Sequence, residues 1–244
     1  MYRKYIHDEK LVKKLELLHE KKYALKTLID KQDEKVTFIV ELAGMARTGK
    51  TVTTERVFEF FKMANYKVLR TKEPAQIVKE RYDITKLSGV EFNDKTLEIS
   101  REQLDFCKSY KPDIILQDRG VFDNYIWYQM MFEKGEISEE ELLSKISNMN
   151  SVLKENDQLY LMTADPNIIV QRDYSDQIFL EPRKKTTIEG VTALRKGMEN
   201  LLTKVNSDSI IELDTSYLTE ADTAITISDG IINGMTKKLT YKNM

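Results

Sequence analysis

Eight consecutive residues combine two glycines, a lysine and a threonine in a spacing that suits phosphate. They are Gly44, Met45, Ala46, Arg47, Thr48, Gly49, Lys50 and Thr51. A β-rich run precedes them and a helical stretch follows, which is the context of the Walker A pattern Gly-x-x-x-x-Gly-Lys-Ser/Thr. Glycines allow a tight loop whose backbone N–H groups, with the positive end of the next helix, face negative charge. The sequence therefore predicts a loop that binds a nucleoside triphosphate.

Three side chains of this loop have specific roles in the expected chemistry. Lys50 would reach the β- and γ-phosphates, and the Thr51 hydroxyl would bind Mg²⁺, which neutralises charge as the γ-phosphoryl group leaves. Arg47 would add another cation beside the phosphates. We therefore expect ATP and Mg²⁺ as cofactors, with residues 44–51 as the nucleotide-binding residues.

An acidic side chain should stand near this loop on a neighbouring strand. Asp118 ends the apolar run DIILQD, where a carboxylate for magnesium or for accepting a proton would fall. Aspartate is also a favoured helix N-cap, so Asp118 could instead cap a helix that begins near Val121. The two roles can coexist, and the sequence leaves both open.

Five β-rich runs alternate with helical patterns and must position these residues. The expected strands are 36–44, 66–74, 113–120, 158–166 and 209–216. The expected helices cover 51–64, a region up to about Ser109, 121–132, a segment capped by Ser138 and one opened by a Thr186–Glu189 capping box. Such alternation predicts an α/β chain with the P-loop NTPase fold: a five-stranded parallel sheet with helices on both faces and ligands at the strands' carboxyl ends.

Residues 1–34 form a separate N-terminal extension in this interpretation, and residues 35–244 the main domain. Within the extension, residues 8–34 form an amphipathic helix whose apolar stripe is Leu11, Leu15, Leu18, Leu25 and Ile29. Lys22 interrupts the stripe. The helix could pair with a second copy, giving a homodimer, or pack against the chain's own core.

Composition excludes several classes of protein. The 244 residues are 41% apolar and 32% charged with a net charge of −2, which argues against binding long nucleic acid. Cys107 is the single cysteine, and His7 and His19 lie before the first expected strand, so disulfide, zinc-thiolate and histidine-triad chemistry lack support. Apolar runs are too short to span a bilayer and the N-terminus lacks a signal-peptide pattern, so we expect no membrane partner and a cytoplasmic location.

A phosphate-binding loop indicates only that a nucleotide is bound, and the reaction must be inferred from its surroundings. No Asn-Lys-x-Asp segment for guanine selection occurs, whereas several arginines accompany the loop. Phosphoryl transfer depends on positioning and on cations around the γ-phosphate, a role that Lys50, Arg47, Arg119 and Arg172 can fill. At these motifs the chain resembles the thymidylate kinase and deoxynucleoside kinase group of P-loop kinases.

The resemblance assigns roles on the acceptor side. Lys72-Glu73-Pro74 resembles the segment in which a deoxynucleoside kinase places its catalytic base, and Asp118-Arg119-Gly120 resembles the segment whose arginine binds the acceptor. Arg101 matches another arginine of the acceptor site. Phe122 begins an aromatic cluster that could stack on an acceptor base, although most of its members are expected to pack in the core. The implied substrate-binding residues are Lys72, Glu73, Arg101, Arg119 and Phe122.

A polar stretch at about residues 172–186, flanked by Arg172 and Arg183, resembles the mobile lid of these enzymes. The sequence departs from the thymidylate kinase pattern at Ala46, Leu97 and Gly120. These departures favour an acceptor other than thymidine monophosphate. The implied catalytic residues are Lys50, Arg47, Asp118, Glu73 and Arg172, with Thr51 and Asp118 as Mg²⁺ ligands.

The sequence therefore predicts a phosphotransferase that moves the γ-phosphoryl group of Mg-ATP to a nucleoside monophosphate or a (deoxy)nucleoside. If the acceptor is a hydroxyl, Glu73 or Asp118 should act as the base; a phosphate acceptor requires no strong base. The alternatives are a kinase for another small molecule or a polynucleotide 5′ end, and a non-catalytic ATP-binding switch.

Overall fold

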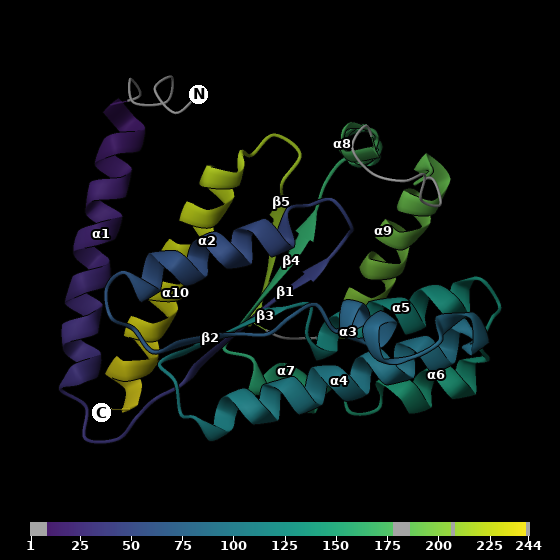
Figure 1. The fold of residues 1–244 in the computed structure, drawn as a ribbon, viewed down its shortest axis with the longest axis horizontal. Coiled ribbons are helices and arrows are strands. Elements are labelled where there is room, and N and C mark those ends of the chain that lie inside the picture. Colours follow the sequence, from purple (N-terminus) through teal and green to yellow (C-terminus); the bar gives the residue numbers. More distant parts are fainter. Residues whose placement is uncertain (1–8, 178–185, 206–207, 243–244) are drawn as a thin grey trace.

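Five parallel strands form one twisted sheet at the centre of the molecule (Figure 1). The structure is a computed structural model that describes residues 9–177, 186–205 and 208–242. The strands are β1 Phe38–Gly44, β2 Val68–Arg70, β3 Ile114–Asp118, β4 Gln158–Thr163 and β5 Ile210–Asp214. Their order is β2-β3-β1-β4-β5, so β1 lies in the middle and its carboxyl end opens between β3 and β4. This confirms the predicted α/β fold.

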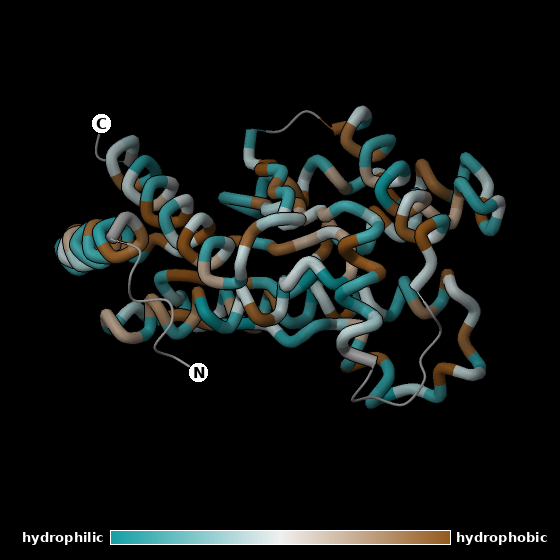
Figure 2. Tube along the Cα trace, turned by 90° about the horizontal axis from the view of Figure 1, so that it is seen from above, coloured by the Kyte–Doolittle hydropathy of each residue, from teal (hydrophilic) through white to brown (hydrophobic). Residues whose placement is uncertain are grey.

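The central strands are apolar because helices cover them on both sides. All seven residues of β1 are buried, and Val40 lies opposite Leu116 of β3 and Gln158 of β4. The strands fall within the predicted runs but are shorter; β2 keeps only three of its nine expected residues. In Figure 2 the brown, hydrophobic stretches lie in the middle of the molecule and on parts of the helices around it.

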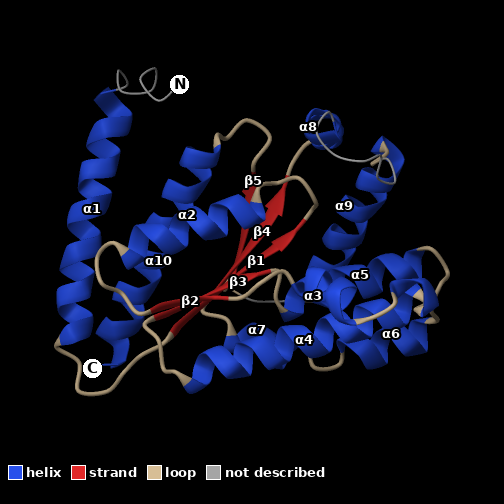
Figure 3. Ribbon diagram, in the orientation of Figure 1, coloured by secondary structure: helices blue, strands red, loops and turns tan. Residues whose placement is uncertain are grey.

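Helices divide between the two faces of the sheet (Figures 1 and 3). One face carries α1 Glu9–Asp30, α2 Lys50–Lys62 and α10 Glu220–Lys242. The other carries α4 Gly89–Ser109, α5 Val121–Glu133, α6 Glu139–Ile146, α7 Met149–Glu155 and α9 Ile188–Leu202. The short α3 Pro74–Arg81 packs on α4, and α8 Pro166–Gln177 packs on α9. A single 3₁₀ turn, η1 Ile84–Lys86, joins α3 to α4.

Successive side chains of β1 alternate between these two faces, as the strand period requires. Val40 and Leu42 contribute to the core beside α2 and α10. Ile39 and Ala43 contribute to the cores beside α4 and α5. Glu41, between them, shares this second face, and its carboxylate reaches the beginning of α5.

Helix starts follow the side-chain caps seen in the sequence, with one correction. Ser138 caps α6 in a complete capping box with Glu141. The cap predicted at Thr186 lies one residue later and is a single bond instead of a box: Thr187 is the N-cap of α9, and its side chain accepts a hydrogen bond from the Gly190 N–H. Thr186 instead hydrogen-bonds Asp173.

The N-terminal helix packs on its own chain, the second of the two arrangements expected for it. Leu18 and Leu25 are buried in the core formed with α2 and α10. Lys22, which interrupts the apolar stripe, is also fully buried, and its ammonium donates to the Phe60 carbonyl in the last turn of α2 at 2.9 Å. A cation is favourable there because carbonyls at a helix C-terminus lack intrahelical partners. Of the described helices, none has the length and hydropathy needed to cross a membrane.

Gly230 of α10 lies close to the sheet, whereas Gly197 of α9 has room for a side chain. A Cβ at Gly230 of α10 would lie inside the van der Waals radius of the buried Tyr160 hydroxyl of β4, whereas a Cβ at Gly197 of α9 would meet Glu133 at an ordinary 3.5 Å. Alanine in an open helical position stabilises by about 0.5–1 kcal/mol, whereas overpacking costs about 1–3 kcal/mol.

We therefore expect Gly230→Ala to lower the free energy of unfolding by about 1–3 kcal/mol and the control Gly197→Ala to raise it slightly. Urea unfolding followed by circular dichroism measures both. Equal effects of the two substitutions would contradict the close contact between α10 and β4.

Candidate active site

The loop after β1 owes its shape to residues with left-handed backbone angles. Gly44 has φ 114° and Gly49, the N-cap of α2, has φ 85°. Any side chain on Gly44 would strike the Met162 carbonyl of β4. Arg47 also adopts a positive φ, 59°, within the loop. Glycine is therefore required at position 44 by both backbone angle and space.

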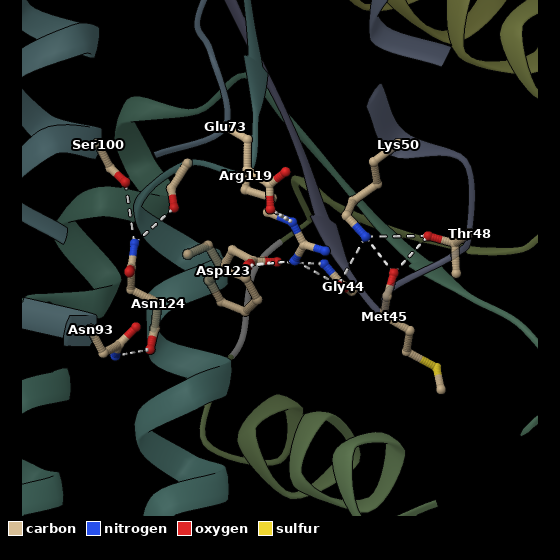
Figure 4. A network of polar contacts seen from close by, with 12 residues as sticks. Gly44, Met45, Thr48, Lys50, Glu73, Asn93, Ser100, Arg119, Asp123 and Asn124 are labelled. Atoms are coloured by element: carbon tan, nitrogen blue, oxygen red, sulfur yellow. Dashed lines mark hydrogen bonds and ion pairs between the residues drawn. The ribbon is translucent and has the colours of Figure 1, made fainter. Parts of the chain in front are cut away.

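Lys50 lies inside the curve of this loop (Figure 4). Its ammonium donates to the Gly44 carbonyl at 3.0 Å, to the Met45 carbonyl and to the Thr48 hydroxyl at 3.3 Å. Burial lowers the pKa of Lys50 to about 7, and the nearby Arg119 cation adds to this shift. An anion in the loop would favour the charged ammonium, so the loop and its lysine suit phosphate.

Thr51 and Asp118 meet across the loop, although they lie far apart in the sequence. The Thr51 hydroxyl hydrogen-bonds the Asp118 carboxylate. Burial raises the pKa of Asp118, and the bond from Thr51 opposes that rise. The Asp118 Oδ1 atom is buried and has no hydrogen-bond partner among the described residues. A hydroxyl beside a carboxylate oxygen without a partner is a donor set that fits Mg²⁺.

Asp118 does not take the alternative role of helix cap. The N-cap of α5 is Gly120, which has no side chain to cap with. The Asp118 backbone N–H is bound by the Thr71 hydroxyl at 3.2 Å, so the end of β3 is fixed independently of α5.

Arg119 joins the acceptor side to the loop (Figure 4). Its guanidinium pairs with Glu73 at 3.1 Å and with Asp123 at 2.9 Å, and it donates to the Gly44 carbonyl at 3.2 Å. Burial alone would lower the pKa of Arg119, but the carboxylates of Asp123 and Glu73 raise it. The structure thus brings Glu73, Asp118, Arg119, Lys50 and Thr51 to one end of the sheet.

The remaining acceptor-side candidates lie in three different surroundings. Arg101 of α4 is half-buried and hydrogen-bonds the Tyr125 hydroxyl of α5. Phe122 is fully buried and packs in the core beneath α5. Lys72 is exposed and lines a cavity of about 460 Å³ between α3 and α4. The Gln103 side chain accepts a hydrogen bond from the Lys72 N–H at 2.9 Å and donates one to the Lys72 carbonyl at 3.1 Å. Their roles stay predictions.

A polar network also connects α4 with the first turns of α5 (Figure 4). The Asn93 side chain donates to the Asn124 carbonyl at 3.0 Å, and the Asn124 side chain donates to Ser100 at 3.3 Å and to the Gly120 carbonyl at 3.1 Å. These bonds fix the position of α4, which carries Arg101, relative to α5.

The two arginines expected near the transferring phosphate lie on the other side of the loop. Arg47 pairs with Asp173 of α8 at 2.7 Å. Arg172 donates to the Thr215 carbonyl at 2.7 Å and to the Arg47 carbonyl at 3.2 Å, so it connects the loop with the segment after β5. The expected lid at 172–186 includes residues 178–185, among them Arg183, which lie outside the described residues.

Three buried acidic residues belong to this site that the sequence interpretation did not assign to it. Asp123 accepts the Gly44 N–H at 2.8 Å, Asp173 holds Arg47, and Glu41 binds the first turn of α5. Glu41 alone had a usable signal, because a charged residue within an otherwise apolar buried strand needs a buried partner. Asp123 and Asp173 lie on helices, where their charges gave no such signal.

Comparisons with known proteins identify the fold and not a family. No protein-family model matches the chain, and no curated protein sequence matches it. Among solved structures, the structure of deoxyadenosine kinase from M. mycoides with bound dATP is similar, with a TM-score of 0.56 and 17% sequence identity. The match covers 79% of this chain and 98% of that chain. The chain therefore shares the α/β fold of that protein, and this likeness does not single out the thymidylate kinases.

Proposed function

We propose that this protein is an ATP-dependent phosphotransferase that moves the γ-phosphoryl group of Mg-ATP to a nucleoside or a nucleoside monophosphate. The observation that carries the proposal is that the Gly44 carbonyl binds two cations, one from each side of the site. The Gly44 carbonyl accepts from Lys50 of the phosphate-binding loop and from Arg119, which also pairs with Glu73. A phosphate-binding cation and an acid–cation pair thus share one backbone group, which places both beside the same loop, where two substrates could be held together.

In this mechanism Lys50 exchanges its carbonyl partners for the β- and γ-phosphates. Thr51 and Asp118 would hold Mg²⁺, which supplies charge neutralisation on the phosphate oxygens. The acceptor oxygen forms a bond to the γ-phosphorus as the bond from that phosphorus to the β–γ bridging oxygen breaks, releasing ADP. Arg119 and Arg47 stabilise the charge on the transferring group, which is the main contribution a protein makes to this reaction.

A hydroxyl acceptor fits the carboxylates better than a phosphate acceptor does. A hydroxyl must lose its proton, and Glu73, oriented by Arg119 at 3.1 Å, can accept it; Asp118 is the second candidate base. The likeness in fold to a deoxyadenosine kinase also favours a nucleoside. We therefore place a (deoxy)nucleoside first and a monophosphate, in a thymidylate kinase-like reaction, second.

The first prediction concerns the reaction itself. Wild-type protein with Mg-ATP should form ADP in response to one class within a panel of ribo- and deoxynucleosides and their monophosphates. Lys50→Ala should reduce this turnover by about 100-fold or more, because the cation at the γ-phosphate is lost. ATP binding without stimulation by any panel member would contradict the proposal and direct attention to other acceptors or to a switch role.

The second prediction concerns the proton on Lys50. Its pKa is about 7, so at about pH 8 the free amine is mostly neutral. Bound phosphate raises this pKa, and binding should therefore take up a fraction of a proton that approaches one. Calorimetry of a non-hydrolysable ATP analogue, in buffers of different ionisation enthalpy, measures the uptake. The uptake should fall towards zero at about pH 6, where Lys50 is already charged, relative to a Lys50→Met control. Equal uptake by both proteins at about pH 8 would contradict the assignment.

The third prediction distinguishes the two candidate bases. Glu73→Gln keeps the shape of the side chain but cannot accept a proton, so kcat with a hydroxyl acceptor should fall on the order of 10²–10⁴-fold. Glu80→Gln, an exposed change on the neighbouring α3, is the matched control and should leave kcat unchanged. Steady-state kinetics at saturating ATP measure both. An unchanged kcat in Glu73→Gln would leave Asp118 as the base, which Asp118→Asn would test.

A further inference from the structure

Glu41 is a fully buried carboxylate in the central strand, three positions before the phosphate-binding loop. Its two oxygens accept hydrogen bonds from the N–H groups of Gly120 at 3.0 Å, Asp123 at 3.1 Å and Phe122 at 3.3 Å. The side chain of Asn156 donates a fourth, at 2.9 Å. The start of a helix leaves four backbone N–H groups without intrahelical partners. At the start of α5, three such groups donate to the Glu41 carboxylate of β1.

This arrangement caps α5 from another element of the fold. The usual cap is a serine, threonine, aspartate or asparagine at the N-cap position, but here that position is Gly120. A Cβ at Gly120 would lie 2.6 Å from the Glu41 Cδ and 2.8 Å from the Gln117 Oε1. Glu41 and Gly120 are therefore matched: the glycine leaves the space that the carboxylate fills, and the carboxylate makes the bonds that a serine would make.

The charged form of Glu41 fits its surroundings. All four partners are N–H donors, so a proton on the carboxyl group would face donors only. Burial raises the pKa of Glu41 to about 7, while the N–H groups of Asp123 and Phe122 oppose that rise. The N-terminus of α5 adds a favourable dipole for the anion.

The segment that Glu41 holds carries the residues that contact the loop. Arg119 immediately precedes the cap and donates to the Gly44 carbonyl at 3.2 Å. Asp123 lies in the first turn, accepts the Gly44 N–H at 2.8 Å and pairs with Arg119 at 2.9 Å. A displaced first turn would move both contacts to Gly44 together, because Arg119 and Asp123 both lie within a few residues of the cap.

We propose that Glu41 is a positioning residue for phosphoryl transfer. Its side chain fixes the first turn of α5 and thereby sets Arg119 and Asp123 against the phosphate-binding loop. The proposal rests on the function proposed above, in which Arg119 acts on the transferring group. Glu41 itself touches no substrate, being fully buried.

A pair of substitutions tests this by exchanging one cap for another. Glu41→Ala leaves the donors of α5 without their acceptor, and Gly120→Ser places a Cβ against Glu41. In the double variant Glu41→Ala/Gly120→Ser the carboxylate that faced the new Cβ is gone, so only the Gln117 amide oxygen must shift before the serine caps α5 from its own position. We expect each single variant to lower kcat/KM for the acceptor on the order of 100-fold, as small misplacements in an active site do. The double variant should regain at least about tenfold relative to Glu41→Ala.

The control separates positioning from general loss of stability. Gly230→Ala strains the packing of α10 on β4, away from the start of α5. Activity is compared per folded molecule, below the Tm of every variant, and Gly230→Ala should stay within about twofold of wild type. If Glu41→Ala loses no more activity than Gly230→Ala, or if the double variant is no more active than Glu41→Ala, the proposal is overturned.

Amide hydrogen exchange gives a second measurement that needs no catalysis. Glu41→Gln keeps the size of the side chain but presents an N–H group to donors. We expect faster exchange than in wild type in peptides covering 119–124 and 44–50, and unchanged exchange in α1. Unchanged exchange in both site peptides overturns the proposal even if activity falls. Absence of any acceptor turnover in wild type would instead reject the proposed function, and exchange would still decide the role of Glu41.

Discussion

The backbone of Gly44 is the constraint on which the site depends. Its N–H is bound by Asp123, its carbonyl accepts from Lys50 and Arg119, and a Cβ on it would lie 2.4 Å from the Met162 carbonyl oxygen of the neighbouring strand. One residue at the end of β1 thus positions the loop lysine and the acceptor-side arginine together. Only glycine can adopt φ 114° in this space, so the whole arrangement rests on the absence of a side chain.

Buried charge is concentrated at the same end of the sheet and is compensated by specific partners. Lys50 is bound by carbonyls, Arg119 by Glu73 and Asp123, and Glu41 by four N–H donors. A buried charge without such partners costs several kcal/mol, so each group fixes the geometry of the next. The depressed pKa of Lys50 follows from this crowding: burial and Arg119 disfavour its charge, and phosphate would restore it.

The face opposite α5 is stabilised in a different way. There α1, α2 and α10 bury apolar side chains against β1 and β4, and the buried Lys22 of α1 binds the last turn of α2. Because α2 begins at Lys50, this contact stabilises the far end of the helix that starts at the phosphate-binding loop. The N-terminal helix therefore contacts the end of α2 that is opposite the phosphate-binding loop.

The sequence alone determined the features that depend on local patterns. The alternation of five β-rich runs with helical patterns specified the parallel α/β sheet, since short crossovers between parallel strands allow few arrangements. The motif at 44–51 specified a phosphate-binding loop, because its glycines and lysine act within eight neighbouring residues. Ser138 marked the start of α6 for the same reason: a cap and its helix are adjacent in sequence.

Only the tertiary structure decided which distant side chains meet. Thr51 binds Asp118, Asp173 binds Arg47, and Glu41 caps a helix about 80 residues later in place of the glycine at its start. The core position of Phe122, a candidate stacking aromatic, likewise follows from the way α5 packs on the sheet. Such contacts depend on strand order and on the direction of side chains across the sheet. Local sequence patterns record neither, so these pairs became visible only when the chain was folded.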